Sequence, residues 1–401
     1  MEIKLTNIQR ICFIAMVLMV SMFNYSEGML DALTNVSVIL FVGVTFVAAN
    51  WKITMPREMK YFAVFMAFCV TSLLFSTAQS ASMNRVVKLM IMAMELMAVY
   101  IYAKQEDKDF LMKVIAAATT LTAVFIDIKG IETIGNTKRV NNITGDSNQV
   151  SAYLVFGILV MIYLLFVNKK KIWIPGIAAS VIAIVLQGSR TAILVAGFMA
   201  VVELILLVRY MKLSLSKRLA LFMLLIIAMS ITVYYIISNP ILYMALGRRF
   251  MSLYEIRTTG SSSMNETSVF NRAHAYRYAL ERFMANPVFG RGIDTFAEFS
   301  RNSDLNKVSF CPNNYLELLQ GIGIFGTVAY YLMYFNILNK SITAKKHRIS
   351  ESSVLVICIL LAMLLMHITV VFYYQKLEYL YLGVMLAMCL GFCEKEVADD
   401  I

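Results

Sequence analysis

The chain has 401 residues, of which 60% are hydrophobic and only 15% charged, and its formal net charge is +11. This composition, with a mean hydropathy of +0.71, excludes an ordinary soluble domain. Strand-like stretches of about 10 alternating residues are absent, which argues against a transmembrane barrel and predicts an all-α polytopic membrane protein.

Taken in chain order, the apolar segments predict about twelve membrane spans, since crossing a bilayer requires roughly 20 apolar residues per helix. These spans lie near 10–24, 33–49, 60–76, 87–103, 110–127, 150–167, 172–187, 191–208, 218–238, 314–338, 352–372 and 378–393. We expect three parts: a bundle of about nine spans over 1–238, an extracytoplasmic helical insert over 239–313, and about three spans over 314–401.

Lysine and arginine positions predict the orientation of these spans. Basic residues precede the first span, and basic clusters follow the second, sixth, eighth and tenth spans. By the positive-inside rule these connections and both termini are cytoplasmic, so the 239–313 insert is extracytoplasmic. Two connections carry bases on the opposite side, at Arg85 and at Lys138 and Arg139.

Three polar groups reach this outer side at the ends of spans. The first is the run 138–149, the second is the short turn 187–191 with Arg190, and the third is the insert with its helix around Arg272. Each also has a structural interpretation. Asn, Gly, Asp and Ser are common in turns, a single arginine at a span end often reaches lipid headgroups, and the insert helix could lie on the membrane surface.

The insert is unusually rich in arginine. It has nine bases, eight of them arginine, and six acids, which gives 9 − 6 = +3. The planar guanidinium fork suits phosphate and carboxylate groups, so this composition indicates an anionic substrate.

Other motifs point away from bound cofactors. The run Gly321-Ile-Gly323-Ile-Phe-Gly326 has the glycine spacing of a dinucleotide site, but it lies in an apolar helical segment and follows no strand. We interpret these glycines as helix-packing positions. The three histidines are scattered and no Cys-x-x-Cys pair occurs, so we expect no metal, no cofactor and no nucleic-acid partner.

Three stretches together resemble the bacterial O-antigen ligase and polymerase superfamily. They are Arg139 with Gly145-Asp-Ser-Asn148, then Ser189-Arg190-Thr191, and finally the segment that runs from Arg272 through Asn286-Pro287 and Gly290-Arg-Gly292 to Asn313-Asn-Tyr-Leu-Glu317. The resemblance implies a multi-span glycosyltransferase of the bacterial cytoplasmic membrane that acts on polyprenyl-diphosphate-linked oligosaccharides at the outer face. A chain-length regulator and a flippase of the same pathway are the candidate protein partners, beside membrane lipid.

One departure from the family pattern separates two activities. Ligases of the superfamily typically have a functional histidine directly before the Asn of the HN-x-YLE stretch, and this chain has Pro312 there. The departure favours a polymerase, with a ligase as the alternative. A transporter or flippase of lipid-linked glycan is the rival from another class, since Glu95, Glu203 and His367 lie within spans.

The resemblance implies that Arg190 and Arg272 bind substrate, with Arg139 as a third candidate. Fixed arginines would stabilise the departing diphosphate, and an acceptor hydroxyl must be positioned and deprotonated. Glu317 is the first choice of general base, ahead of Asp294, Glu298 and His274. The remaining predicted substrate-binding residues are Arg277, Arg291, Asn313, Asn314 and Tyr315.

Overall fold

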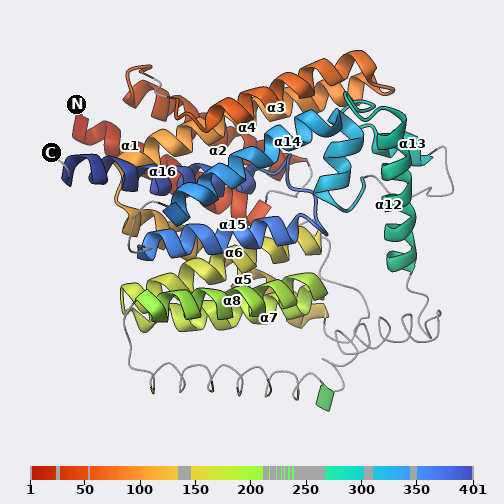
Figure 1. The fold of residues 1–401 in the computed structure, drawn as a ribbon. Coiled ribbons are helices and arrows are strands. Elements are labelled where there is room, and N and C mark those ends of the chain that lie inside the picture. Colours follow the sequence, from red (N-terminus) through yellow and green to blue (C-terminus); the bar gives the residue numbers. More distant parts are fainter. Residues whose placement is uncertain are drawn as a thin grey trace. The chain divides into compact units, whose positions relative to one another are not determined.

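The computed structural model describes residues 2–23, 28–52, 55–133, 146–210, 267–301, 310–343 and 350–399, with isolated positions between 211 and 238. Within these ranges every regular element is a helix and there is no strand (Figure 1). The α-helices are α1 (Glu2–Phe23), α2 (Met29–Ala48), α3 (Met59–Thr71), α4 (Gln79–Gln105), α5 (Lys108–Thr133), α6 (Ser147–Val167), α7 (Ile174–Gln187), α8 (Arg190–Tyr210), α12 (Thr267–Ala285), α13 (Phe296–Arg301), α14 (Asn314–Thr343), α15 (Glu351–Met366) and α16 (Lys376–Asp399), with short 3₁₀ turns at Ser72–Phe75 and Lys171–Trp173.

Seven of the described helices are long and apolar enough to cross a membrane, and three shorter apolar helices accompany them. These helices support an all-α polytopic membrane protein. The predicted span near 218–238 lies almost wholly outside the described residues, so a total of about twelve stays a prediction. So does the division into a bundle, an insert and a second bundle.

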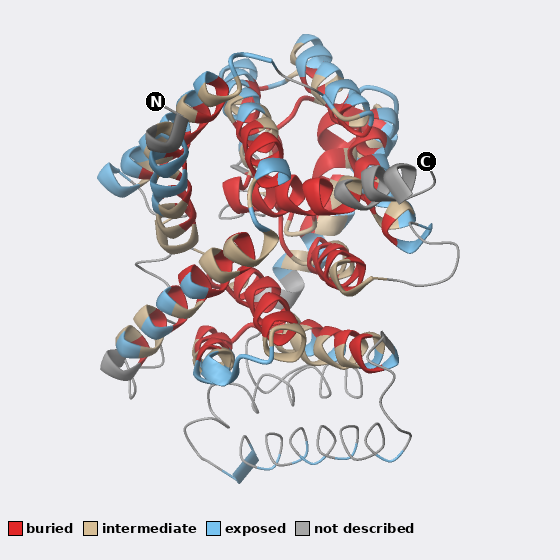
Figure 2. Cartoon of the chain, turned by 90° about the vertical axis from the view of Figure 1, so that its left-hand side faces the viewer, coloured by how far each residue is buried: buried red, intermediate tan, exposed pale blue. Residues whose placement is uncertain are grey.

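The chain forms two compact units. Unit 1 contains residues 1–111, 267–344 and 367–401, and unit 2 contains residues 112–266 and 345–366. In Figure 2 the buried residues concentrate between the helices of each unit, while many helix faces stay exposed.

In unit 1, α4 packs against α16 and α2, and α14 packs against α3 and α12. The 30-residue helix α14 is not continuous, because Gly323 has φ 74° and ψ −176°. The two halves of α14 therefore meet at a kink.

In unit 2, α6 is buried along most of its length and packs against α7, α8 and α15. Local sequence defines the helix ends. The Asp146 side chain accepts the Asn148 backbone N–H at 2.8 Å and caps α6. Gly188 has φ 65° and ends α7, so that α8 begins two residues later, as the short polar turn predicts.

One predicted boundary is wrong. The apolar run predicted a span over 352–372, but α15 ends at Met366. The backbone N–H groups of Phe372 and Tyr373 donate to the Asn314 side-chain oxygen, at 2.9 and 3.1 Å, instead of continuing a helix. A side-chain acceptor far along the sequence thus competes with the helical hydrogen bonds.

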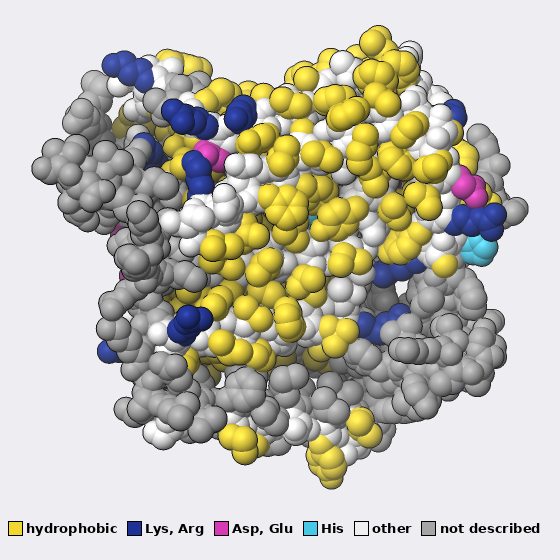
Figure 3. All heavy atoms as spheres, viewed as in Figure 1, with side chains coloured by type: hydrophobic (Ala, Val, Ile, Leu, Met, Phe, Trp, Pro, Cys, Tyr) yellow, Lys and Arg dark blue, Asp and Glu magenta, His cyan; other side chains and the backbone are white. Residues whose placement is uncertain are grey.

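Large hydrophobic side chains remain exposed on several helices, as the space-filling view shows (Figure 3). Ile39 of α2, Phe198 of α8 and Phe335 of α14 are each at least half exposed. A soluble monomer rarely exposes so much apolar surface, whereas a helix that faces lipid does.

Candidate functional site

The segment 286–294 follows α12 and is held against α14 by backbone hydrogen bonds. The N–H groups of Arg291 and Gly292 donate to the carbonyls of Gln320 and Gly321, at 2.9 and 3.0 Å, and the N–H of Ile324 donates to the carbonyl of Pro287 at 2.8 Å. The kink in α14 frees these groups, because residues around Gly323 cannot complete the helical pattern. The segment therefore supplies the partners that the broken helix lacks.

Two glycines permit this close approach. A Cβ on Gly323 would lie 2.1 Å from the Val288 carbonyl oxygen, and one on Gly290 would lie 2.4 Å from the backbone of Gly321. Both have positive φ, at 74° and 71°. The sequence predicted helix packing for the glycines of 321–326, and at Gly326 a Cβ would indeed lie 2.8 Å from Phe68 of α3. Gly321 and Gly323, however, lie against the 286–294 segment.

Arg282 of α12 is fixed in place beside this segment. Its side chain is buried and donates from Nε to Gln320 Oε1 at 2.9 Å and from Nη2 to Thr295 Oγ1 at 2.8 Å. Its guanidinium lies over the Phe299 ring, 4.6 Å from the centroid. Burial, together with the nearby charge of Arg291, lowers the pKa of Arg282 to about 10, so it stays charged at neutral pH.

Arg282 and Arg291 line an open pocket of about 430 Å³. The pocket is formed by α12, α13, the 286–294 segment and the connection before α4. Its lining residues are Thr77, Glu281, Arg282, Ala285, Arg291, Glu298 and Phe299. This volume falls within the range of roughly 300–1,000 Å³ that small-ligand sites occupy.

Glu317 lies one turn into α14 and is buried. Its Oε2 accepts the backbone N–H of Cys311 at 2.8 Å. The carboxylate also interacts electrostatically with Arg85, Arg282 and Asp294. The first turn of α14 thus places a carboxylate within electrostatic range of arginines from two other helices.

Arg85 of α4 joins this cluster from another part of the chain. Its Nη2 pairs with Asp294 Oδ2 at 2.9 Å, and its guanidinium lies 3.9 Å from the centroid of the Tyr374 ring. Two serines hold the backbone of Ile293: Ser82 Oγ of α4 donates to its carbonyl, and its N–H donates to Ser72 Oγ of the 3₁₀ turn before α4. The basic residue that departs from the positive-inside pattern therefore has a partner in the insert.

The segment 367–375 packs over the start of α14. The Asn314 N–H donates to the His367 carbonyl at 2.8 Å, and the Tyr276 hydroxyl donates to the carbonyls of Pro312 and Ile368, at 3.1 and 3.3 Å. These bonds join α12, α14 and the segment before α16 into one assembly.

A buried polar network continues from this point within unit 1. His367 Nε2 lies 3.0 Å from Glu378 Oε1, and its Nδ1 lies 3.2 Å from the Tyr331 hydroxyl. The hydroxyls of Tyr330 and Tyr334 also donate to Glu378. His367 and Glu378 are both fully buried, and the network satisfies both His367 nitrogens and Glu378 Oε1, while Glu378 Oε2 has no described partner.

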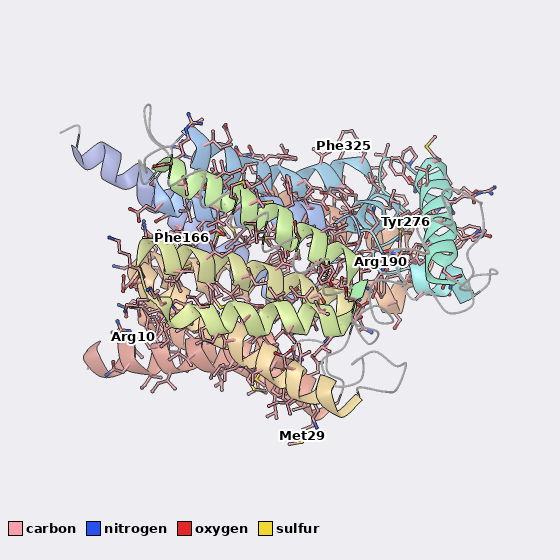
Figure 4. The ribbon with its side chains drawn as sticks, turned by 90° about the horizontal axis from the view of Figure 1, so that it is seen from below. Arg10, Met29, Phe166, Arg190, Tyr276 and Phe325 are labelled. Carbon is pink, nitrogen blue, oxygen red and sulfur yellow. The ribbon has the colours of Figure 1, made fainter. Side chains whose placement is uncertain are left out.

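The predicted arginines are distributed over both units. Arg190 begins α8 in unit 2, and Tyr276, which interacts electrostatically with the half-buried Arg272, lies in α12 (Figure 4). Arg277 is 76% exposed and pairs with Glu281 at 2.9 Å, as an ordinary i,i+4 pair. Arg139 lies outside the described residues.

The predicted asparagines have structural partners. Asn313 accepts the Leu316 N–H at 3.0 Å and so caps α14, while the fully buried Asn314 donates to the Tyr331 hydroxyl at 2.8 Å. Tyr315 stacks on Tyr331, with ring centroids 4.6 Å apart. Of the other base candidates, Glu298 lines the pocket, Asp294 pairs with Arg85, and His274 is exposed.

Several pocket residues were not among the predicted site residues. Arg282 was counted among the arginines of the insert that indicate an anionic substrate, but it was not singled out. It follows Ala275 and Ala279 at helical spacing, and both alanines are buried against Phe296 and Cys311. That small-residue face was the available signal. No sequence pattern indicated that Thr77 or Phe299 belongs to the site. In the described ranges no cluster of three or more His, Cys, Asp or Glu could hold a metal, and the expected lack of a cofactor stays a prediction.

Comparison with known families identifies part of the chain. Residues 175–331 match the family model described as O-Antigen ligase, whereas no curated protein matches the chain significantly. The matched segment includes α12, α13, the 286–294 segment and the first half of α14, and so most of the pocket. The match confirms the resemblance that the motifs predict: residues 175–331 are similar to the O-antigen ligase family.

Proposed function

We propose that the chain is a polysaccharide polymerase, which joins polyprenyl-diphosphate-linked oligosaccharide repeats at the outer face of the bacterial cytoplasmic membrane. The observation that supports this most is Glu317, a buried carboxylate that interacts with Arg85 and Arg282 within an O-antigen ligase domain. A buried carboxylate can accept the proton of an acceptor hydroxyl. The negative charge that develops on the diphosphate is stabilised by the arginines assigned to it below.

The reaction needs no nucleotide, since the donor sugar is already activated by its diphosphate. An acceptor hydroxyl of one lipid-linked repeat attacks the anomeric carbon of the donor glycan, and a new C–O bond forms. The bond from that carbon to the diphosphate oxygen breaks, and polyprenyl diphosphate leaves. Glu317 takes the hydroxyl proton.

We assign the diphosphate to Arg272 and Arg190, with Arg139 as a third ligand. This assignment rests on the motifs that these arginines share with the superfamily, and on the strength of guanidinium–phosphate hydrogen bonds. A chain-length regulator and a flippase of the same pathway are the protein partners that the proposal implies.

A polymerase is preferred to a ligase because of Pro312. Ligases of the superfamily typically have histidine there, and in this chain the Pro312 carbonyl accepts a hydrogen bond from Tyr276 instead. The other described histidines do not replace it, because His274 is exposed and His367 is bound to Glu378 and Tyr331. A ligase, which uses the same donor and a different acceptor, is the second candidate, and the name of the matched family favours it.

The test is the glycan that remains on the polyprenyl carrier after the gene is deleted, measured by mass spectrometry with a probe of leaflet accessibility. Single repeats at the outer face support the polymerase. Full-length polymer still on the carrier would mean a ligase, and single repeats trapped at the inner face would mean a flippase.

Complementation with variants then tests the diphosphate assignment. We expect Arg190→Ala and Arg272→Ala each to abolish chain growth while the protein stays in the membrane. Arg57→Ala, an exposed arginine of the connection between α2 and α3, is the matched control and should restore normal polymer. Normal polymer with both Arg190→Ala and Arg272→Ala would reject the assignment.

A further inference from the structure

We propose that the pocket between α12 and α13 binds the glycan portion of the lipid-linked substrate and not its diphosphate. This inference rests on the proposed function and adds a site for the sugars. The argument for this site uses six residues of the pocket lining. They are Glu281 and Arg282 of α12, Arg291 of the 286–294 segment, Glu298 and Phe299 of α13, and Thr77.

The charges of the pocket argue against a diphosphate. Its lining contains two arginines, Arg282 and Arg291, and two carboxylates, Glu281 and Glu298, so the formal charges cancel at 2 − 2 = 0. Like charges in close proximity are unfavourable, and a diphosphate here would lie near Glu298 and near Glu281, the second of which also pairs with Arg277. In a site that binds phosphate alone, the Glu298 carboxylate of the separate helix α13 would only repel the ligand.

The same residues suit sugar hydroxyls. A hydroxyl group both donates and accepts hydrogen bonds, so it can bind a carboxylate and a guanidinium at the same time. Phe299, whose ring also packs against the Arg282 guanidinium, adds apolar surface for the C–H groups of a sugar, and the buried Arg291 Nε has no described hydrogen-bond partner. Few side chains other than carboxylates, guanidinium groups and aromatic rings line this pocket.

Part of the pocket is ordered before any ligand arrives. Arg282 is held by Gln320, Thr295 and the Phe299 ring, so it loses little freedom on binding. The Arg291 backbone is fixed on both sides, since its N–H donates to Gln320 and its carbonyl accepts from Thr77 at 3.4 Å. Thr77 lies outside the matched residues 175–331, so one wall of the pocket is supplied by a part of the chain that the family model does not cover.

A charge reversal at Glu298 separates the two ligand chemistries. The protein is purified in lipid nanodiscs and titrated with two probes: the repeat oligosaccharide released by mild acid from the carrier of the producing cell, and inorganic diphosphate. If the pocket binds glycan, Glu298→Lys removes a carboxylate acceptor and should raise the Kd of the oligosaccharide at least about tenfold. If the pocket binds diphosphate, the same substitution should instead tighten the binding of inorganic diphosphate.

Two further variants complete the test. Asp107→Lys makes the same charge change beyond the opposite end of α4, about 40 Å along that helix from Thr77, and should leave the oligosaccharide Kd unchanged. Thr77→Val keeps the shape of its side chain and should weaken oligosaccharide binding through the lost hydroxyl.

Tighter diphosphate binding by Glu298→Lys, or an unchanged oligosaccharide Kd in both pocket variants, would overturn the proposal. Its failure is distinct from failure of the proposed function. Binding of the oligosaccharide by a protein that extends no chains would reject the polymerase and retain the pocket. Normal chain growth by Glu298→Lys with an unchanged Kd would reject the pocket and retain the polymerase.

Discussion

At the residue scale, Arg277 and Arg282 show what the sequence can and cannot indicate. The two arginines are five residues apart on α12, yet the first is exposed in a surface pair and the second is buried against α13 and α14. An arginine-rich helix was predictable from composition. The small residues Ala275 and Ala279 were the local signal for the inward face of α12. The partners that hold Arg282 there, Gln320 and Thr295, are distant in sequence and could not be predicted from it.

Glu317→Gln tests the proposed base with little structural change. The glutamine oxygen can still accept the Cys311 N–H, so the first turn of α14 keeps its hydrogen bond. We expect the rate of chain growth to fall roughly 10²- to 10⁴-fold, because the amide cannot take a proton. The rate is measured with lipid-linked repeats in proteoliposomes. Glu351→Gln, in the first turn of α15, is the control, and a wild-type rate for Glu317→Gln would exclude Glu317 as the base.

At the element scale, the kinked helix α14 organises the site. The sequence predicted a helix from residue 314 and packing glycines at 321–326. The structure has the helix, and Gly326 packs against α3, but Gly321 and Gly323 lie against the 286–294 segment. The sequence could not predict that the 286–294 segment supplies hydrogen bonds to the broken turn, since these partners are about 30 residues apart in sequence. The irregular segment 367–375 was missed for a similar reason, because its stability depends on Asn314.

Gly323→Ala should displace the 286–294 segment. A Cβ there would meet the Val288 carbonyl oxygen at 2.1 Å, and alanine disfavours a φ of 74°. We expect the free energy of unfolding to fall by about 1–3 kcal/mol, together with loss of oligosaccharide binding. Thermal unfolding in detergent measures the first effect. Gly197→Ala in α8, where nothing lies within 4 Å of the added Cβ, should be neutral or stabilising; equal losses in both variants would contradict the explanation.

The pair between α1 and the end of α4 predicts a pH dependence. Arg10 donates to both oxygens of Glu106, at 2.7 Å each, and this lowers the pKa of Glu106 from 4.5 to about 2. A lowered folded-state pKa means that the stabilisation is complete above pH 4.5 and is lost as the pH falls toward 2. The stability difference between the native chain and Glu106→Gln should therefore shrink over that interval. A difference that stays constant down to pH 2.5 would contradict the pairing.

At the scale of the whole molecule, composition was sufficient for the class of protein. The apolar spans predicted an all-α membrane protein, and each predicted span within the described residues overlaps a helix, although the span predicted over 352–372 runs past the end of α15. The grouping of helices into units was beyond sequence reasoning, because unit 1 combines three separate stretches of the chain. Hydropathy indicates which residues of the sequence form a helix, but it does not indicate which other helix that helix packs against.

The predicted orientation can be tested on intact cells with a membrane-impermeant maleimide. We expect Met284→Cys, exposed on α12, to be labelled from outside, because the insert is predicted to be extracytoplasmic. Lys170→Cys, in the connection between α6 and α7, should be labelled only after the membrane is opened. The unsubstituted chain provides the background, and its described cysteines are buried except for the half-buried Cys12. The reverse labelling pattern would mean that the true topology is the inverse of the predicted one.

The attachment of the 286–294 segment to α14 has a consequence for the diversification of these enzymes. Main-chain hydrogen bonds and two glycines hold the segment, and they do not depend on which side chains it carries. Arg291 can therefore be exchanged while its backbone stays in place. A scaffold of this kind lets new sugar preferences arise through single substitutions on a constant frame, so pocket residues transplanted between such chains should transfer preference without redesign of the helices.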